Sequence, residues 1–388
     1  MAALAVSPPP TGTHIVATLF YSTTLPPEAR IHPDSTHHNP HDIIPTASLT
    51  SLTHGSVPTE NIDNYPLEPP TPGPNPLDHL YGSYISRGCL TSFRQALAKV
   101  IPNFHDKSVL EKALDNPSWP RVMEVTFFIP TGSQITVESL RRNETISRYE
   151  REWSIETVFQ VNDVWRRYKR LAVFDMDSTL IQQEVIDEIA REIGVVKEVS
   201  AITAAAMNGE LDFEESLRRR CALLKGVPST VWETLKTRIT LNTGAADLVR
   251  SLKKLGFKTA VLSGGFTPLA GWLAGELGLD YFHANHLVVS ADGATLTGEV
   301  TGEIVHAERK RLHVLDIAAK EGVSLQQVIA VGDGANDLPM MGVAGIGVAF
   351  HAKPRVQMEA PARLNTSTLT DVLYLFGLTK EEQEELLR

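Results

Sequence analysis

Polar side chains come closely after three short apolar segments of this chain. The segments are Leu171–Phe174, Thr259–Leu262 and Val328–Val331, and the polar residues after them are Asp175, Asp177, Ser263, Asp333, Asn336 and Asp337. Clustered carboxylates attract a hard cation that prefers oxygen ligands, and Mg²⁺ is the first candidate. Once the cation offsets their repulsion, one carboxylate can attack phosphorus and another can donate and accept the proton. These residue types therefore predict metal-assisted phosphoryl transfer.

The apolar segments are rich in β-branched residues, and helical patterns such as Ala246–Leu255 and Lys310–Lys320 lie between them. A fourth segment of the same kind is Ile346–Phe350. Strands that alternate with helices predict an α/β fold with a parallel, doubly wound sheet. In such sheets ligands bind outside the carboxyl ends of the strands. We therefore expect the four aspartates and the serine to meet in one crevice.

The first two of these strands are separated by about 85 residues, far more than a crossover helix needs. Four segments in this stretch have helical patterns: Glu184–Ile193, Val199–Met207, Glu214–Leu224 and Thr230–Ile239. We expect an inserted helical subdomain, a cap, at about residues 184–245. The whole unit is predicted to span residues 169–388.

The first 168 residues differ in composition and in the pattern of their apolar segments, and they are predicted to form a smaller α+β N-terminal domain. Residues 1–80 hold 15 of the 24 prolines, so a Pro/His-rich disordered insertion is expected at about 22–80. Around it, His14–Tyr21 and Val122–Ile129 are predicted strands, Leu90–Ile101 is a predicted helix, and Ser133–Trp153 is predicted to be mostly helical. No motif that carries chemistry lies here.

The composition excludes several classes of protein. The chain has 36 Lys and Arg against 46 Asp and Glu, and this formal net charge of −10 argues against a nucleic-acid binder. No window approaches the roughly 18 consecutive apolar residues of a membrane helix, and the start lacks the pattern of a secretory signal. Two cysteines are too few for a disulfide framework, so a reducing, cytoplasmic location is expected.

Other motifs with similar residues do not fit. An EF-hand that begins at Asp175 would need glycine at its sixth position and glutamate at its twelfth, but Leu180 and Ile186 stand there. The segment GDGAND has Asp337 where the dinucleotide fingerprint requires its third glycine. Any one polar cluster could be an ordinary loop. Three of them at strand ends of one alternating pattern favour a site.

DMDSTL, LSGGF and GDGANDLPM resemble the motifs of the haloacid dehalogenase superfamily of phosphotransferases. Within it, DMDSTLIQQEVIDEIA and AMNGELDFEESLRRR resemble the phosphoserine phosphatase family, and the resemblance covers about residues 170–365. It implies a Rossmann-like parallel sheet with an inserted helical cap, Mg²⁺ as cofactor and a phosphoaspartate intermediate. The implied reaction is the hydrolysis of O-phospho-L-serine to L-serine and phosphate, the last step of the phosphorylated route of serine biosynthesis.

The resemblance also implies roles for the catalytic residues. Asp175 matches the nucleophile, whose carboxylate also binds Mg²⁺. Asp177 matches the general acid and base, which binds the metal through its backbone carbonyl. Ser263 and Gly264 match the phosphate-binding loop. Lys310 matches the lysine that neutralises the phosphoryl group, although spacing alone does not distinguish it from Arg309 or Arg311.

Further roles follow from the same match. Asp333 is implied as a metal ligand, Asp337 and Thr179 as supporting residues, and Asn336 as a residue close to substrate. In the cap, Glu184 is implied to meet the substrate amino group and Arg220 to hold its carboxylate. Met207 and Phe213 match apolar residues that close over the site. Without the resemblance, Met207 and Phe213 would be interpreted as helix-packing side chains, and Glu184 and Arg220 as solvated charges on helices.

Alternatives remain open at this point. The substrate could be another small phosphomonoester or a phosphoserine within a protein, although a peptide would mask the charges that Glu184 and Arg220 are implied to bind. A non-catalytic amino-acid sensor built on the same fold is a different class of function. The sequence does not fix the oligomeric state, and a homodimer is one arrangement that it allows. The resemblance further suggests an N-terminal domain related to the ACT fold.

Overall fold

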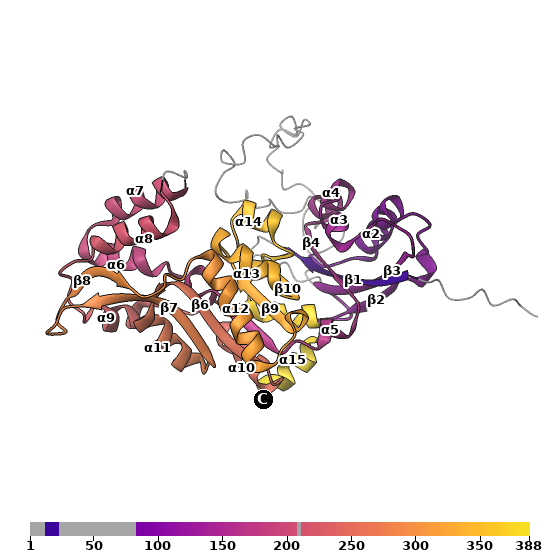
Figure 1. The fold of residues 1–388 in the computed structure, drawn as a ribbon. Helices are drawn as coiled ribbons and strands as arrows, with labels where there is room; N and C mark the ends of the chain where they lie inside the picture. Colours follow the sequence, from indigo (N-terminus) through magenta and orange to yellow (C-terminus); the bar gives the residue numbers. More distant parts are fainter. Residues whose placement is uncertain (1–11, 23–82, 208–210) are drawn as a thin grey trace, which may run out of the picture.

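The structure is a computed structural model that describes residues 12–22, 83–207 and 211–388. Apart from Ser22, the predicted insertion at about 22–80 lies outside these described residues. The described chain contains two β-sheets that lie side by side, with the predicted cap at the far end from the N-terminal sheet (Figure 1). None of the helices in the described part is both long and apolar enough to cross a membrane.

The N-terminal sheet has four antiparallel strands in the order β2-β3-β1-β4. Its strands are β1 (Gly12–Tyr21), β2 (Leu110–Ala113), β3 (Val122–Pro130) and β4 (Ile155–Val161). Helix α2 (Arg87–Val100) follows β1, and helices α3 (Val137–Arg141) and α4 (Glu144–Trp153) connect β3 to β4. This is a split β-α-β arrangement. The predicted elements are present here, but β2 and β4 were not predicted.

Both faces of the N-terminal sheet are buried. On one face, Phe93 of α2 and Tyr149 of α4 pack with Phe159 of β4. On the other face, Phe20 of β1 belongs to the same apolar cluster as Tyr374, near the C-terminus, with the two rings 6.3 Å apart. The sheet is therefore packed between its own helices and the second half of the chain.

The second sheet has seven strands in the order β11-β10-β9-β5-β6-β7-β8. They are β5 (Leu171–Phe174), β6 (Lys258–Phe266), β7 (Tyr281–Val289), β8 (Leu296–Thr301), β9 (Val328–Gly332), β10 (Ile346–Phe350) and β11 (Ala362–Leu364). All neighbours are parallel except the β7–β8 pair. This confirms the predicted α/β fold with a parallel sheet and adds one antiparallel strand at its edge.

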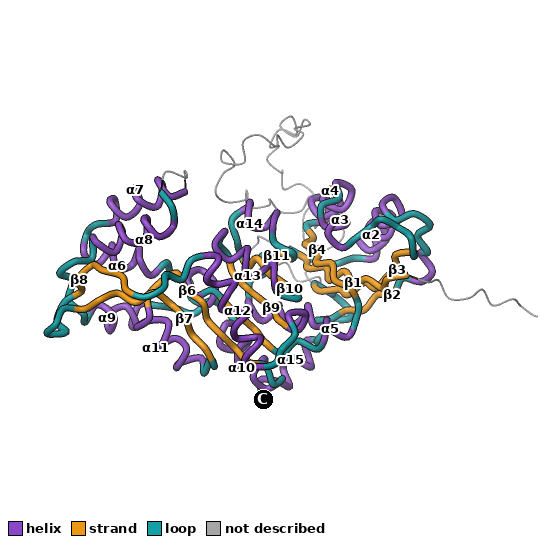
Figure 2. The backbone as a smooth tube through the Cα atoms, in the orientation of Figure 1, coloured by secondary structure: helices purple, strands orange, loops and turns teal. Residues whose placement is uncertain are grey.

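Alternate residues of β5 enter different cores on the two faces of this sheet. Ala172 and Phe174 belong to one apolar cluster, whereas Leu171 and Val173 belong to another. The flanking helices are α10 (Ala245–Lys254), α11 (Thr267–Leu277), α12 (Ala307–Glu321), α13 (Leu338–Val343), α14 (Pro354–Glu359) and α15 (Lys380–Leu387). Helices line both sides of the strands (Figure 2), which explains why β5 is apolar throughout.

Four helices form the cap between β5 and β6, as predicted: α6 (Val185–Ile193), α7 (Val196–Met207), α8 (Phe213–Ala222) and α9 (Val231–Arg238). The two chain segments that lead into and out of the cap pair with each other through an isolated antiparallel bridge between Ile181 and Leu241. The side-chain amide of Asn242 donates to the carbonyls of Ser178, Thr179 and Ile181 at 3.2, 2.7 and 3.2 Å. The start of the cap is thus fixed to the segment that returns from it.

Candidate active site

Three neighbouring strands bring the predicted catalytic residues together. The order β9-β5-β6 places the carboxyl ends of these parallel strands side by side. Asp175 follows β5 and Asp333 follows β9, as predicted. Ser263 differs slightly from its prediction, because β6 continues to Phe266 and the serine lies within the strand. The pairing of β6 with β7 shifts register between Leu262 and Phe266, so the strand is irregular at this point.

A fully buried lysine connects two of the aspartates. Lys310 lies in the first turn of α12, and its side chain is 0% exposed. Its Nζ atom lies 2.8 Å from Oδ1 of Asp175 and 2.7 Å from Oδ1 of Asp337. Burial alone would lower the pKa of Lys310, but the two carboxylates outweigh burial and raise it, so the lysine stays charged.

Asp337 uses both of its carboxylate oxygens within the protein. While Oδ1 faces Lys310, Oδ2 accepts hydrogen bonds from the backbone amides of Asp333 at 3.2 Å and Gly334 at 3.0 Å. These bonds shape the loop that carries Asp333. The geometry therefore agrees with a supporting role for Asp337.

The donor set fits a hard divalent cation. One carboxylate oxygen each from Asp175, Asp333 and Asp337 lies within 4.8 Å of the others. Because the oxygens of Asp337 are taken by the lysine and the loop amides, Asp175 and Asp333 are the better ligands. The hydroxyl of Thr179 donates to Oδ1 of Asp333 at 2.9 Å and orients that carboxylate.

The electrostatics of the aspartate cluster also favour a bound cation. Burial, and then the charge of Asp337, raise the pKa of Asp175 well above its usual range. Burial raises the pKa of Asp333 to about 7, again with a contribution from Asp337. One lysine therefore does not neutralise the carboxylates gathered here, and a bound cation would offset the remaining negative charge.

Asp177, the predicted general acid and base, lies beside the start of α6. Its Oδ2 atom accepts a hydrogen bond from the backbone amide of Val185 at 3.3 Å. Its Oδ1 atom is buried and has no hydrogen-bond partner among the residues that the structure describes. Burial, and then the charge of Glu184, raise the pKa of Asp177 well above its ordinary value. A carboxyl group whose pKa is raised in this way holds its proton more readily than a free carboxyl group, which a general acid requires.

The loop around Ser263 is held by a residue that the sequence analysis missed. Asn285 of β7 is 1% exposed. Its side-chain NH₂ group donates to the backbone carbonyl of Gly264 at 2.8 Å, and its side-chain oxygen accepts from the backbone amide of Val305 at 2.8 Å. The hydroxyl of Ser263 is also fixed, because it accepts from the amide of Gly265 at 2.8 Å. Strand β7 also contains two histidines, so no local signal in its sequence distinguishes Asn285.

The cap contributes an aromatic ring next to this loop. A Cβ atom placed on Gly264 would lie 3.5 Å from Cζ of Phe213, so the ring lies beside the glycine. Phe213 is the first residue of α8. The ring therefore lies next to the predicted phosphate-binding loop. The side chain of Met207, predicted to have the same role, lies outside the described part of the structure.

The two predicted selectivity residues lie in the same part of the cap. Oε1 of Glu184 accepts a hydrogen bond from the hydroxyl of Ser178 at 2.7 Å. Burial lowers the pKa of Arg220, while the carboxylates of Asp187 and Glu184 counteract that effect, which places Glu184 in the field of this arginine. Asn336 lies in the short turn Ala335–Asp337, on the loop that carries Asp333.

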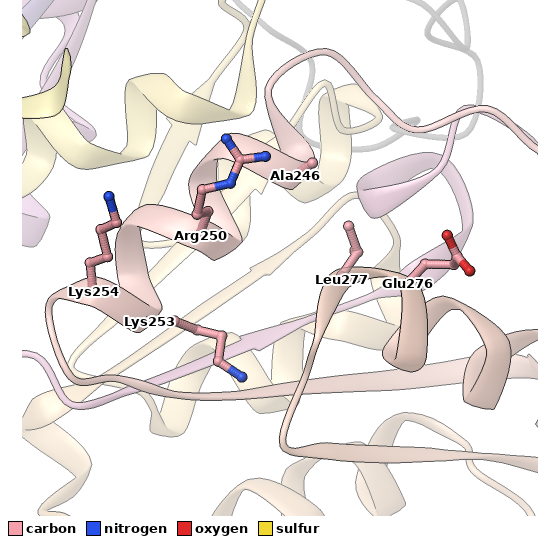
Figure 3. A pocket seen from close by; sticks show the side chains of 6 residues that line it. All are labelled: Ala246, Arg250, Lys253, Lys254, Glu276 and Leu277. Atoms are coloured by element: carbon pink, nitrogen blue, oxygen red, sulfur yellow. The ribbon is translucent and has the colours of Figure 1, made fainter. Parts of the chain in front are cut away.

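A hollow of about 410 Å³ lies elsewhere, between α10 and α11, where Figure 3 shows its lining side chains. Arg250, Lys253 and Lys254 come from one helix and Glu276 from the other. None of the clustered aspartates lines it. It is therefore separate from the site described above.

Comparisons with known proteins agree with this geometry. A sequence profile of haloacid dehalogenase-like hydrolases matches residues 169–345. A probable phosphoserine phosphatase of Schizosaccharomyces pombe is 49% identical over 219 residues, which cover 56% of this chain and 74% of that protein. A phosphoserine phosphatase of Saccharomyces cerevisiae is 38% identical over 290 residues, which cover 74% of this chain and 93% of that protein. A solved substrate-bound phosphoserine phosphatase complex is similar with a TM-score of 0.50 at 44% identity, covering 53% of this chain and 97% of its own.

Proposed function

This chain belongs to the phosphoserine phosphatases of the haloacid dehalogenase-like hydrolase family, and from that premise we propose that its site at the ends of β5, β6 and β9 hydrolyses O-phospho-L-serine to L-serine and phosphate. The observation that supports this location is the buried contact between Lys310 and Asp175, beside Asp333. A buried, charged lysine next to an aspartate at a strand end can bind a phosphoryl group and hold the nucleophile at once.

In the first half of the reaction, a carboxylate oxygen of Asp175 attacks phosphorus. The bond between phosphorus and the seryl oxygen breaks, and Asp177 donates its proton to that oxygen, which leaves as the hydroxyl of serine. Lys310 and the hydroxyl of Ser263 interact with the phosphoryl oxygens. Mg²⁺ held by Asp175, Asp333 and the backbone carbonyl of Asp177 would supply further charge neutralisation.

In the second half, a water molecule attacks the phosphorus of the aspartyl phosphate. Asp177, now a carboxylate, takes a proton from the water, and the bond between Asp175 and phosphorus breaks. Free phosphate leaves, and Asp177 is protonated again for the next cycle. The raised pKa of Asp177 suits it for both steps, because the carboxyl group holds its proton more readily than a free aspartic acid and its carboxylate is a stronger base.

A phosphate-release screen of the purified protein tests the proposed substrate. The panel contains phosphoserine, other small phosphomonoesters and a phosphoserine peptide, each with and without Mg²⁺. Preference for free phosphoserine supports the proposal. A preference for the peptide or for another phosphomonoester supports the alternative phosphatase reading, and no release from any substrate supports a non-catalytic sensor.

Substrate selectivity gives a sharper prediction. If Glu184 and Arg220 bind the amino and carboxylate groups of phosphoserine, Glu184→Gln and Arg220→Ala should each lower kcat/KM for phosphoserine roughly 10- to 150-fold, the value of a charged hydrogen bond in a closed site. The loss on p-nitrophenyl phosphate should be far smaller. Arg220→Lys should also be impaired, because an ammonium group cannot pair bidentately with a carboxylate. Equal losses on both substrates would instead indicate general damage to the cap.

The proposal also includes the location of the protein, its assembly and the relationship of its N-terminal domain. The expected location is cytoplasmic, no nucleic-acid partner is expected, and a homodimer is one assembly that the sequence allows. The N-terminal domain is proposed to be related to ACT regulatory domains. The split β-α-β order of its sheet is compatible with that relation.

A further inference from the structure

Ser178 has an unusual backbone conformation for a serine. It follows Asp177 in the turn after β5, and its φ and ψ angles are 55° and 0°. This left-handed region favours glycine, because the Cβ atom of other residues crowds the backbone there. A serine at this position therefore costs conformational free energy that a glycine would avoid. We therefore expect an interaction of the Ser178 side chain to offset this cost.

The backbone around Ser178 is held on both sides. Its amide donates to the carbonyl of Gln183 at 3.3 Å, and its own carbonyl accepts from the side chain of Asn242 at 3.2 Å. The turn is thus determined by its neighbours. Because the backbone is fixed, the direction of the Ser178 hydroxyl is restricted as well.

That hydroxyl has one clear use. It donates to Oε1 of Glu184 at 2.7 Å. Glu184 is exposed and immediately precedes α6, so without this bond its side chain would be free to rotate. The hydrogen bond opposes this rotation.

We propose that Ser178 is a positioning residue for substrate selectivity, whose hydroxyl holds Glu184 where the carboxylate can meet the amino group of phosphoserine. The bond occupies one oxygen of Glu184 and leaves the other available to an ammonium group. This inference rests on the proposed function, because that proposal assigns the amino-group contact to Glu184.

The test compares Ser178→Gly with Ser178→Ala. Both variants lose the hydroxyl, but only alanine keeps the backbone strain, and glycine adopts the left-handed conformation freely, so Ser178→Gly should fold. The measured quantity is the ratio of kcat/KM for phosphoserine to kcat/KM for p-nitrophenyl phosphate. Both variants should lower this ratio about threefold to tenfold, mainly through a higher KM for phosphoserine, as expected for one lost hydrogen bond.

A double-mutant cycle with Glu184→Gln shows whether the effect passes through Glu184. In that background neither Ser178 variant should lower the ratio further. Ser154→Gly is a matched control, because Ser154 has a left-handed φ of 49° at the end of α4, within the N-terminal domain. It should leave the ratio unchanged.

Each contrary outcome has a separate meaning. A ratio that falls in Ser178→Ala but not in Ser178→Gly would assign the effect to the backbone and overturn the inference. An undiminished effect of Ser178→Gly in the Glu184→Gln background would overturn it too. If Glu184→Gln lowers the ratio while Ser178→Gly does not, only the inference fails. If Glu184→Gln leaves the ratio unchanged, the proposed contact of Glu184 fails together with it.

Discussion

Replacing Asp175 with asparagine should lower phosphate release by at least about a thousandfold while the protein stays folded. The amide has nearly the shape of the carboxylate, but it can neither attack phosphorus nor offer an anionic ligand to the metal. Lys310 keeps its second partner, Asp337, at 2.7 Å, so the buried ammonium remains paired. Phosphate release and circular dichroism measured on the same preparation check both parts of the expectation.

The covalent intermediate identifies the nucleophile directly. Acid quenching during turnover, followed by peptide mass spectrometry, should place the phosphoryl group on Asp175. A phosphoryl group trapped on any other residue would contradict the assignment. Asp247→Asn is a suitable control, since Asp247 lies on α10 in an exposed pair with Arg250 and should tolerate the same change of charge.

Removal of divalent metal should abolish activity, and added Mg²⁺ should restore it. Burial, and then the charge of neighbouring carboxylates, raise the pKa values of Asp175, Asp177 and Asp333, and a bound cation would offset both effects. Ca²⁺ should support activity poorly, because its looser coordination lets Asp175 bind through both oxygens and blocks in-line attack. Mg²⁺ should also raise the melting temperature, since it binds only the folded site. Full activity in a chelator would remove the metal from the mechanism.

The requirement for Mg²⁺ should depend on pH in a defined direction. The pKa of Asp333 is raised to about 7 without metal, so a growing fraction of this carboxyl is protonated as the pH falls through that value. Mg²⁺ must displace this proton, and its apparent affinity should therefore weaken below about pH 7. Titration of Mg²⁺ at several pH values, read by melting temperature and by activity, checks this. A half-saturating concentration that is constant from pH 8 to 6 would contradict it.

Much of the fold and the catalytic centre could be predicted because local patterns determine them. Segments such as Leu171–Phe174 are apolar throughout, which is typical of a strand buried on both faces, and an aspartate directly follows β5 and β9. The cap was predictable from chain length and helical periodicity. These features depend on residues that are close together in the sequence.

The distinction between Lys310 and its two arginine neighbours depends on the orientation of helix α12. Arg309 and Arg311 pair with Glu303 and Glu308 at the surface of the molecule, whereas Lys310 points inward. A signal was available, because Val314 and Ile317 lie four and seven residues further along α12 and are buried on its inner face. The apolar face of that helix, continued towards its N-terminus, includes position 310.

Other features depend on contacts between distant parts of the chain, so they could not be predicted from neighbouring residues in the sequence. Asn285 connects the Ser263 loop to Val305 only because β7 pairs with an irregular stretch of β6. Strands β2, β4 and β11 are short or mixed in polarity, so their patterns are weak. The left-handed conformation of Ser178 likewise arises from bonds to Gln183 and Asn242 rather than from the residue itself.

The shared core of the N-terminal sheet and the C-terminal segment has a consequence for folding cooperativity. Phe20 packs with Tyr374, and the buried guanidinium of Arg166 bridges Glu124 of β3, at 2.7 Å, and the carbonyl of Leu375, at 3.1 Å. Unfolding of either half would expose apolar surface of the other half. It would also leave the buried guanidinium of Arg166 without one of its partners. The two sheets, although each has its own topology, should therefore lose their structure in a single transition, and the stability of the phosphatase half depends on the first strand of the chain.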